Sequence, residues 1–110
     1  MTRVLKNIDS STPLCLADLV SCLSGQVVSK TLVQNDSVSF TIFAFDQGEE
    51  ISTHKANGDA LVTILEGTGQ ITIDGTPHQL DAGQSIVMPA HTPHSVYAPS
   101  PFKMTLLVVS

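Results

Sequence analysis

The sequence predicts an all-β domain, a barrel or sandwich of short strands preceded by one short helix. After Gly25 the chain alternates short apolar runs with turn signals to its end, which is typical of such folds. Asp74-Gly75 favours a type I′ hairpin turn, because both central residues of that turn take positive φ. Several runs are apolar on both faces, a pattern that requires a sheet covered on both sides. The 110 residues suit one domain.

The segment before Gly25 is expected to form the helix. Thr12-Pro13 resembles a helix start, because a hydroxyl can cap and proline is tolerated in the first turn. Four apolar residues then recur at helical spacing: Leu16, Leu19, Val20 and Leu23. Gly25 is a typical helix end. We therefore divide the one domain into an N-terminal segment with a short helix, residues 1–25, and a barrel, residues 26–110.

Eight strands are expected in the barrel. They cover residues 27–33, 38–45, 60–65, 70–73, 76–80, 85–88, 94–97 and 103–109. In the second of them, Val38, Phe40, Ile42 and Ala44 share one face, while Phe43 and Phe45 lie on the other. The barrel interior can bury only one of these faces. The outer face is expected to pack against the helix or against a second chain, and we predict a homodimer.

Composition excludes several partners. Only 14% of residues are charged, against a typical ~25%. The net charge is −5 and the five Lys and Arg residues are scattered, so nucleic acid is not an expected partner. No apolar run approaches the ~20 residues that span a bilayer, and the N-terminus lacks the apolar core of a secretory signal. Cys15 and Cys22 are expected as free thiols, which indicates the cytoplasm.

Two stretches carry the residues that could do chemistry. One reads GEEISTHKANGDALVTILEG from Gly48, and the other reads GQSIVMPAHTPHSVYA from Gly83. Together they resemble the two motifs of the cupin family, small β-barrels that usually hold a metal in the barrel mouth. The positions in register are Gly48, His54 and Gly67 in the first motif and Gly83, Pro89 and His94 in the second. The resemblance covers residues 40–109 and implies a jelly-roll barrel, the double-stranded β-helix.

The first motif is degenerate. Ala56 stands where the family has its second histidine, and Ala60 stands where it has glutamate. His91 occupies a position where glycine is usual. Of the four usual metal ligands, His54 and His94 remain.

The resemblance implies that His54 and His94 point into the barrel, in a ligand pocket that Met88, Ala56 and Ala60 also line. The pair is either half of a metal site, for Mn, Fe, Ni or Zn, or two buried histidines bridged by water. Three residues are candidates for additional metal ligands: Glu50, Asp59 and His91. For Asp59, strand alternation and a Gly58-Asp59 turn or cap argue against a ligand role.

Three functions remain open. The barrel binds a small organic molecule, with the two histidines as hydrogen-bonding or acid–base groups. Alternatively it is a divalent-metal-dependent isomerase, decarboxylase or dioxygenase with an improvised ligand set. The third reading is a dimeric structural or sensory module with a vestigial pocket. We favour the first as a statement about binding, and we assign no catalytic residue and no reaction.

Overall fold

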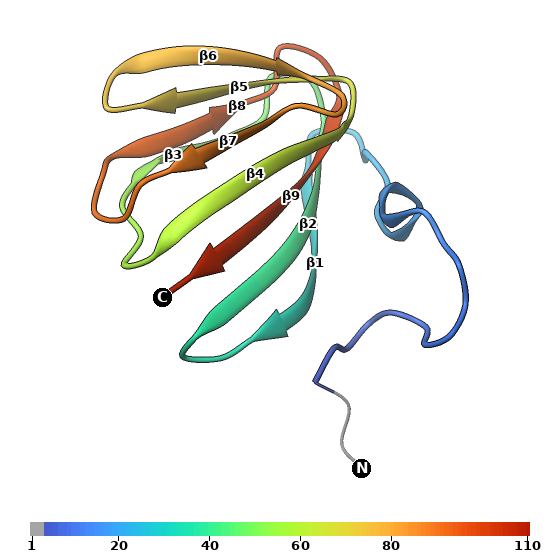
Figure 1. Ribbon diagram of the computed structural model, residues 1–110. Coiled ribbons are helices and arrows are strands. Elements are labelled where there is room, and N and C mark those ends of the chain that lie inside the picture. Colours follow the sequence, from blue (N-terminus) through green and yellow to red (C-terminus); the bar gives the residue numbers. More distant parts are fainter. Residues whose placement is uncertain (1–3) are drawn as a thin grey trace.

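Two antiparallel sheets face each other across one apolar core (Figure 1). The computed structural model describes residues 4–110, in which nine strands and one short 3-10 helix form. In chain order the elements are η1 (Leu16–Leu19), β1 (Val27–Gln34), β2 (Val38–Phe45), β3 (Glu50–His54), β4 (Asp59–Glu66), β5 (Thr68–Ile73), β6 (Thr76–Asp81), β7 (Ser85–Met88), β8 (His94–Tyr97) and β9 (Phe102–Val109). The five-stranded sheet has the order β1-β2-β9-β4-β7, and the four-stranded sheet has the order β3-β8-β5-β6. The expected all-β jelly-roll barrel is confirmed.

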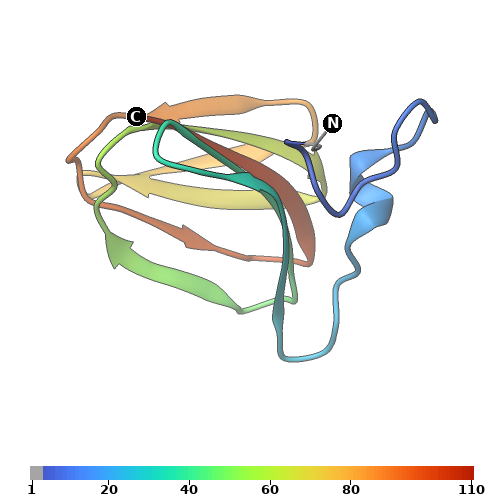
Figure 2. The ribbon, with the colours of Figure 1, turned by 90° about the horizontal axis from the view of Figure 1, so that it is seen from below.

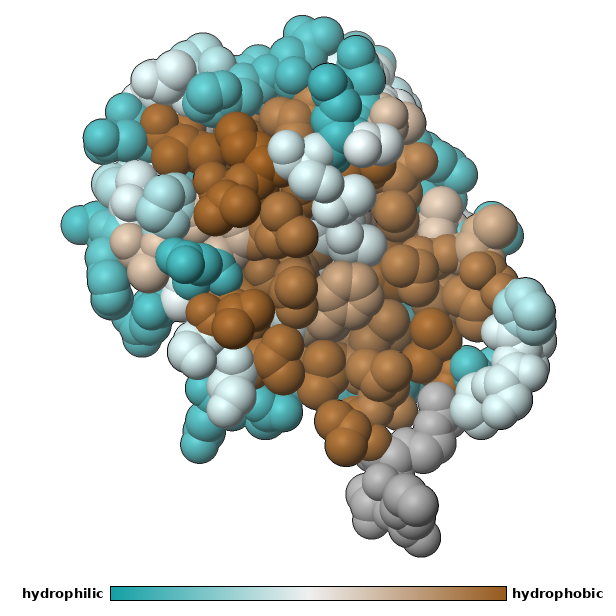
Figure 3. All heavy atoms as spheres, in the orientation of Figure 1, coloured by the Kyte–Doolittle hydropathy of each residue, from teal (hydrophilic) through white to brown (hydrophobic). Residues whose placement is uncertain are grey.

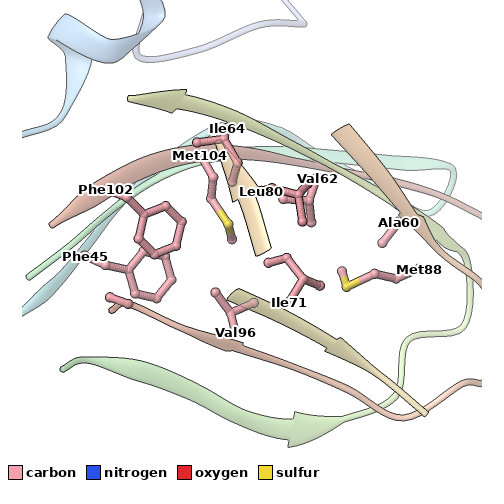
Figure 4. Packing of buried hydrophobic residues seen from close by; sticks show 11 residues of the cluster. Phe45, Ala60, Val62, Ile64, Ile71, Leu80, Met88, Val96, Phe102 and Met104 are labelled. Carbon is pink, nitrogen blue, oxygen red and sulfur yellow. The ribbon is translucent and has the colours of Figure 1, made fainter. Parts of the chain in front are cut away.

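The core lies between the sheets and is filled by inward-facing side chains (Figure 4). Its fully buried members include Val62, Ile64, Ile71 and Met104. The rings of Phe45 and Phe102 stack at 4.7 Å between centroids toward one end of this core, and Ala60 and Met88 lie toward the other. Aromatic rings thus fill one end of the core, and a small and a flexible side chain fill the other, each of them at most 1% exposed.

Eight of the strands lie within two residues of their expected bounds. Asp74 and Gly75 have φ of 49° and 83°, as the predicted turn between β5 and β6 requires. The strand β3 was not expected, because Ile51 is its only apolar residue and the other four are exposed. It forms through antiparallel pairing with β8, which a local hydrophobic pattern does not reveal.

The prediction of a helix up to Gly25 is wrong. Only the four residues Leu16–Leu19 form a 3-10 turn, and no side chain caps it. Cys15 before it and Val20 after it both have extended backbone. Even so, the segment does cover part of the sheet: Val20 packs with Leu32, Ile42 and Ala44 on the outer face of the five-stranded sheet.

This N-terminal segment covers only part of that outer face (Figure 2). Farther along the sheet, Leu61 on β4 and Val87 on β7 are exposed, and apolar surface extends across the strands (Figure 3). Within residues 4–110 there is no helix with the length and apolar character needed to cross a membrane.

Candidate functional site

The site is built around a contact between two histidines on neighbouring strands. His54 ends β3 and His94 begins β8, and the two are directly opposite each other in the antiparallel register. Their Nε2 atoms lie 3.1 Å apart, with ring centroids 4.3 Å apart and ring planes at 74°. His94 is only 3% exposed, whereas His54 is exposed rather than enclosed within the barrel. The pair therefore lies at the boundary between the core and solvent, with His94 on the core side and His54 on the solvent side.

The remaining ring nitrogens are held by the backbone. Nδ1–H of His54 donates to the carbonyl oxygen of Ser52 at 2.9 Å, and Nδ1–H of His94 donates to that of Thr92 at 3.1 Å. A carbonyl oxygen can only accept, so the tautomer that forms either bond carries a ring proton on Nδ1. Both rings consequently present Nε2 to each other.

Burial lowers the pKa of His94 from its ordinary value of 6.5. The neighbouring charge of His54 acts in the same direction, and the hydrogen bond to Thr92 opposes both with a smaller effect. The lowered pKa favours the neutral form of His94 at pH 7.

The apolar candidates lie at the same end of the barrel as the histidines. Ala60 and Met88 are cross-strand neighbours on β4 and β7, and each is 1% exposed. Ala56 is half-buried in the loop between β3 and β4, and its carbonyl accepts the N–H of His91 at 2.8 Å. That hydrogen bond joins the β3–β4 loop to the β7–β8 loop beside the histidine pair.

Residues 41–110 match the family model described as the cupin domain. The chain belongs to the cupin family. This cupin is similar over 99% of its length to a conserved protein of unknown function from Streptococcus pyogenes, with 42% identity, 96% coverage of that chain and a TM-score of 0.97. A cupin superfamily protein from Desulfitobacterium hafniense has 35% identity, 96% coverage of both chains and a TM-score of 0.91.

A curated relative of this cupin is the dimethylsulfoniopropionate lyase DddW from Ruegeria pomeroyi. The two are 29% identical over 79 residues, which make up 67% of this chain and 52% of the lyase. This cupin thus spans about half the length of the lyase.

The three additional metal-ligand candidates do not join the histidine pair of this cupin. Glu50 is exposed at the start of β3, and His91 is exposed in the β7–β8 loop with a φ of 63°. Asp59 Oδ1 accepts the N–H of Ala90 at 2.9 Å. Within the described range, residues 4–110, no three His, Cys, Asp or Glu side chains are grouped to hold a metal ion. A stable site takes at least three protein ligands, so the side chains present do not fit a resident metal.

Two features of the site could not be predicted from the sequence. The carbonyls of Ser52 and Thr92 act through the backbone; the only sequence signal is that each precedes a motif histidine by two residues. Asp59 holds the β7–β8 loop rather than a ligand, a role that only the fold reveals.

A surface hollow of about 500 Å³ lies elsewhere, against the N-terminal segment of this cupin. Its lining residues are Val4, Leu5, Ile8, Asp9, Ser10 and Ser11. None of the candidate site residues is among them, and within residues 4–110 Asp9 is the only charged residue that lines the hollow. The hollow is therefore separate from the histidine pair.

Proposed function

We propose that this cupin binds a small organic molecule at His54 and His94. The observation that supports the proposal is the contact between a buried and an exposed imidazole at the end of an apolar core. Such a pair offers polar recognition next to apolar side chains, the combination that small-molecule sites use. Ala56 and Ala60 are smaller than the histidine and glutamate of the family motif.

The proposal concerns binding and includes no reaction. We do not propose a lyase activity like that of DddW, because the similarity covers only 52% of that protein. In addition, alanine stands at positions 56 and 60, where the family motif has metal ligands. The free thiols of Cys15 and Cys22 support a reducing compartment, so we place the protein in the cytoplasm.

The test is a fragment screen read by methyl NMR of the methionines. Met88 reports on the site, and Met104, which is fully buried in the core, serves as the internal control. Ligands should shift the Met88 methyl signal and leave that of Met104 in place, and His54→Ala should weaken binding while the fold persists. If the site is vestigial, no fragment should shift the Met88 methyl signal.

Elemental analysis of protein purified without an affinity tag is the companion measurement. We expect no stoichiometric metal after dialysis against a chelator. One metal atom retained per chain would contradict this proposal and favour a metal-dependent activity.

A further inference from the structure

Two residues that do not join the histidine pair, Asp59 and His91, meet in the loop that leads into His94. The β7–β8 loop makes a hydrogen-bonded turn over residues 89–92 and enters β8 two residues later. His91 is one of the two central residues of this turn, and the other, Ala90, donates its N–H to Asp59 Oδ1 at 2.9 Å. Both side chains set aside as metal ligands thus belong to one structural unit beside the site.

His91 makes this turn unfavourable for the isolated chain. Its φ of 63° lies in the left-handed region, which favours glycine and is costly for a residue with a Cβ atom. Glycine is also the usual residue at this position of the family motif. A strained conformation of this kind persists only where the surrounding structure enforces it. Contacts from outside the loop must therefore hold the turn.

Two hydrogen bonds from the segment before β4 supply this hold. The two central N–H groups of the turn are both engaged: that of Ala90 donates to Asp59 Oδ1, and that of His91 donates to the Ala56 carbonyl at 2.8 Å. The bond to Asp59 has a charged acceptor, which makes it the stronger of the two. It is also the one that depends on a side chain and can be removed by substitution.

The last strand seats the anchor itself. Asp59 lies opposite Val109 in the antiparallel register of β4 and β9. Gly58, which precedes it, packs so close to the Val109 carbonyl oxygen that a Cβ atom at this position would overlap it. The five-stranded sheet thus fixes the Asp59 carboxylate, and the loop that the carboxylate holds enters β8 of the four-stranded sheet.

We infer that Asp59 is a positioning residue for His94: it holds the strained turn at His91 and so fixes the backbone that aims the His94 ring. The Thr92 carbonyl oxygen, at the end of the turn, lies 3.1 Å from Nδ1 of His94 and moves with the loop. The contact with His54 depends on the same ring orientation. The role of Asp59 in ligand binding rests on the proposed function, whereas the ring orientation can be measured without a ligand.

The test compares Asp59→Ala, which removes the acceptor, with Asp59→Asn, which keeps a side-chain carbonyl oxygen in its place. At one fixed pH, NMR of Asp59→Ala should show shifted ring-proton signals of His94, because that ring lies edge-on to the ring of His54. Exchange of the Ala90 N–H should become at least about 10-fold faster, the factor for loss of a hydrogen bond to a charged group. Asp59→Asn should bring both readouts most of the way back to their wild-type values.

Asp81→Ala is the matched control, because it removes another exposed carboxylate that accepts one hydrogen bond, from Thr68 Oγ1 at 2.9 Å. It should leave both readouts unchanged. The double variant Asp59→Ala with His91→Gly tests the reason for the anchor. Glycine adopts the turn without strain, so the His94 ring signals should return toward the wild type. The same double variant decides the question if Asp59→Ala alone does not fold.

The outcomes separate this inference from the proposed function. Unchanged His94 signals in a folded Asp59→Ala variant, or no recovery in the double variant, would overturn the positioning role. Fragments that shift the Met88 methyl signal and bind less tightly to Asp59→Ala than to Asp81→Ala would support both proposals. Equal binding to the two variants would overturn the role of Asp59 in binding and leave small-molecule binding standing. If no fragment binds the wild type, the proposed function fails and the ring signals still decide the positioning role.

Discussion

His94 is a buried histidine with a lowered pKa, which makes the stability of the fold dependent on pH. The unfolded chain binds a proton at His94 near its ordinary pKa of 6.5, whereas the folded chain binds it only at lower pH. The contribution of neutral His94 is therefore fully present above pH 6.5 and is lost as the pH falls toward the lowered pKa of the folded state.

We predict that the free energy of unfolding decreases below pH 6.5 and that His94→Gln makes this decrease shallower. Urea unfolding at a series of pH values measures the slope, which remains informative even if the substitution lowers stability at every pH. His78→Gln is the control and should keep the wild-type slope. A stability that rises on acidification would mean that the pair takes up a proton on folding, which contradicts the lowered pKa of His94.

The positions of the two histidines could be predicted from the sequence, but their environment could not. The motif spacing identified His54 and His94, because ligand positions in this family are set by distance along the chain. The exposure of His54 depends on β3, a strand of polar residues that forms only by pairing with β8. The carbonyl partners of the two rings depend on local backbone direction, which side-chain identity does not encode.

At the scale of elements, the strands were predicted well because apolar runs and turn residues agree there. The N-terminal segment shows the opposite case. Leu16, Leu19, Val20 and Leu23 match helical spacing, yet the chain is extended from Val20, where Val20 and Cys22 contact the sheet and Leu23 is exposed. Leu and Ala in this segment favour a helix, so the contacts of Val20 and Cys22 with the sheet determined the conformation against local propensity.

Lys103 holds this segment on the sheet. Its ammonium group donates to the Ala17 carbonyl at 2.7 Å and lies 3.5 Å from Glu66 Oε1. The lysine side chain is 14% exposed and that of Glu66 is 55% exposed. A charged hydrogen bond from a partly buried donor contributes more than an ion pair to an exposed carboxylate.

We predict that Lys103→Met destabilises the fold by about 1.5–3 kcal/mol, the range for a hydrogen bond to a charged group. Glu66→Gln should cost less than about 1 kcal/mol, as is usual for an exposed ion pair. Urea unfolding compares the two variants, and hydrogen exchange should show faster exchange in the N-terminal segment of Lys103→Met. Equal losses in both variants would show that the ion pair, and not the bond to Ala17, holds the segment.

At the scale of the whole molecule, one apolar row crosses the outer face of the five-stranded sheet. Cross-strand pairing aligns one residue from each strand: Val33, Phe40, Leu107, Leu61 and Val87. The N-terminal segment packs near the β1 end, but Leu61 is 36% and Val87 is 55% exposed at the other. Apolar residues gather on this face (Figure 3). A contiguous apolar surface of this kind usually marks a site of interaction with another molecule.

We propose that two copies of the chain pair through this row about a twofold axis, so that each apolar row covers the other. Light scattering at micromolar concentration should give about twice the chain mass. Leu61→Lys places a charge within the row and should shift the protein toward monomer, because burying an unpaired ammonium is costly. Tyr97→Lys alters an exposed aromatic residue on β8, in the other sheet, and should leave the dimer intact. A wild-type monomer, or a Leu61→Lys variant as dimeric as Tyr97→Lys, would rule out pairing through this face.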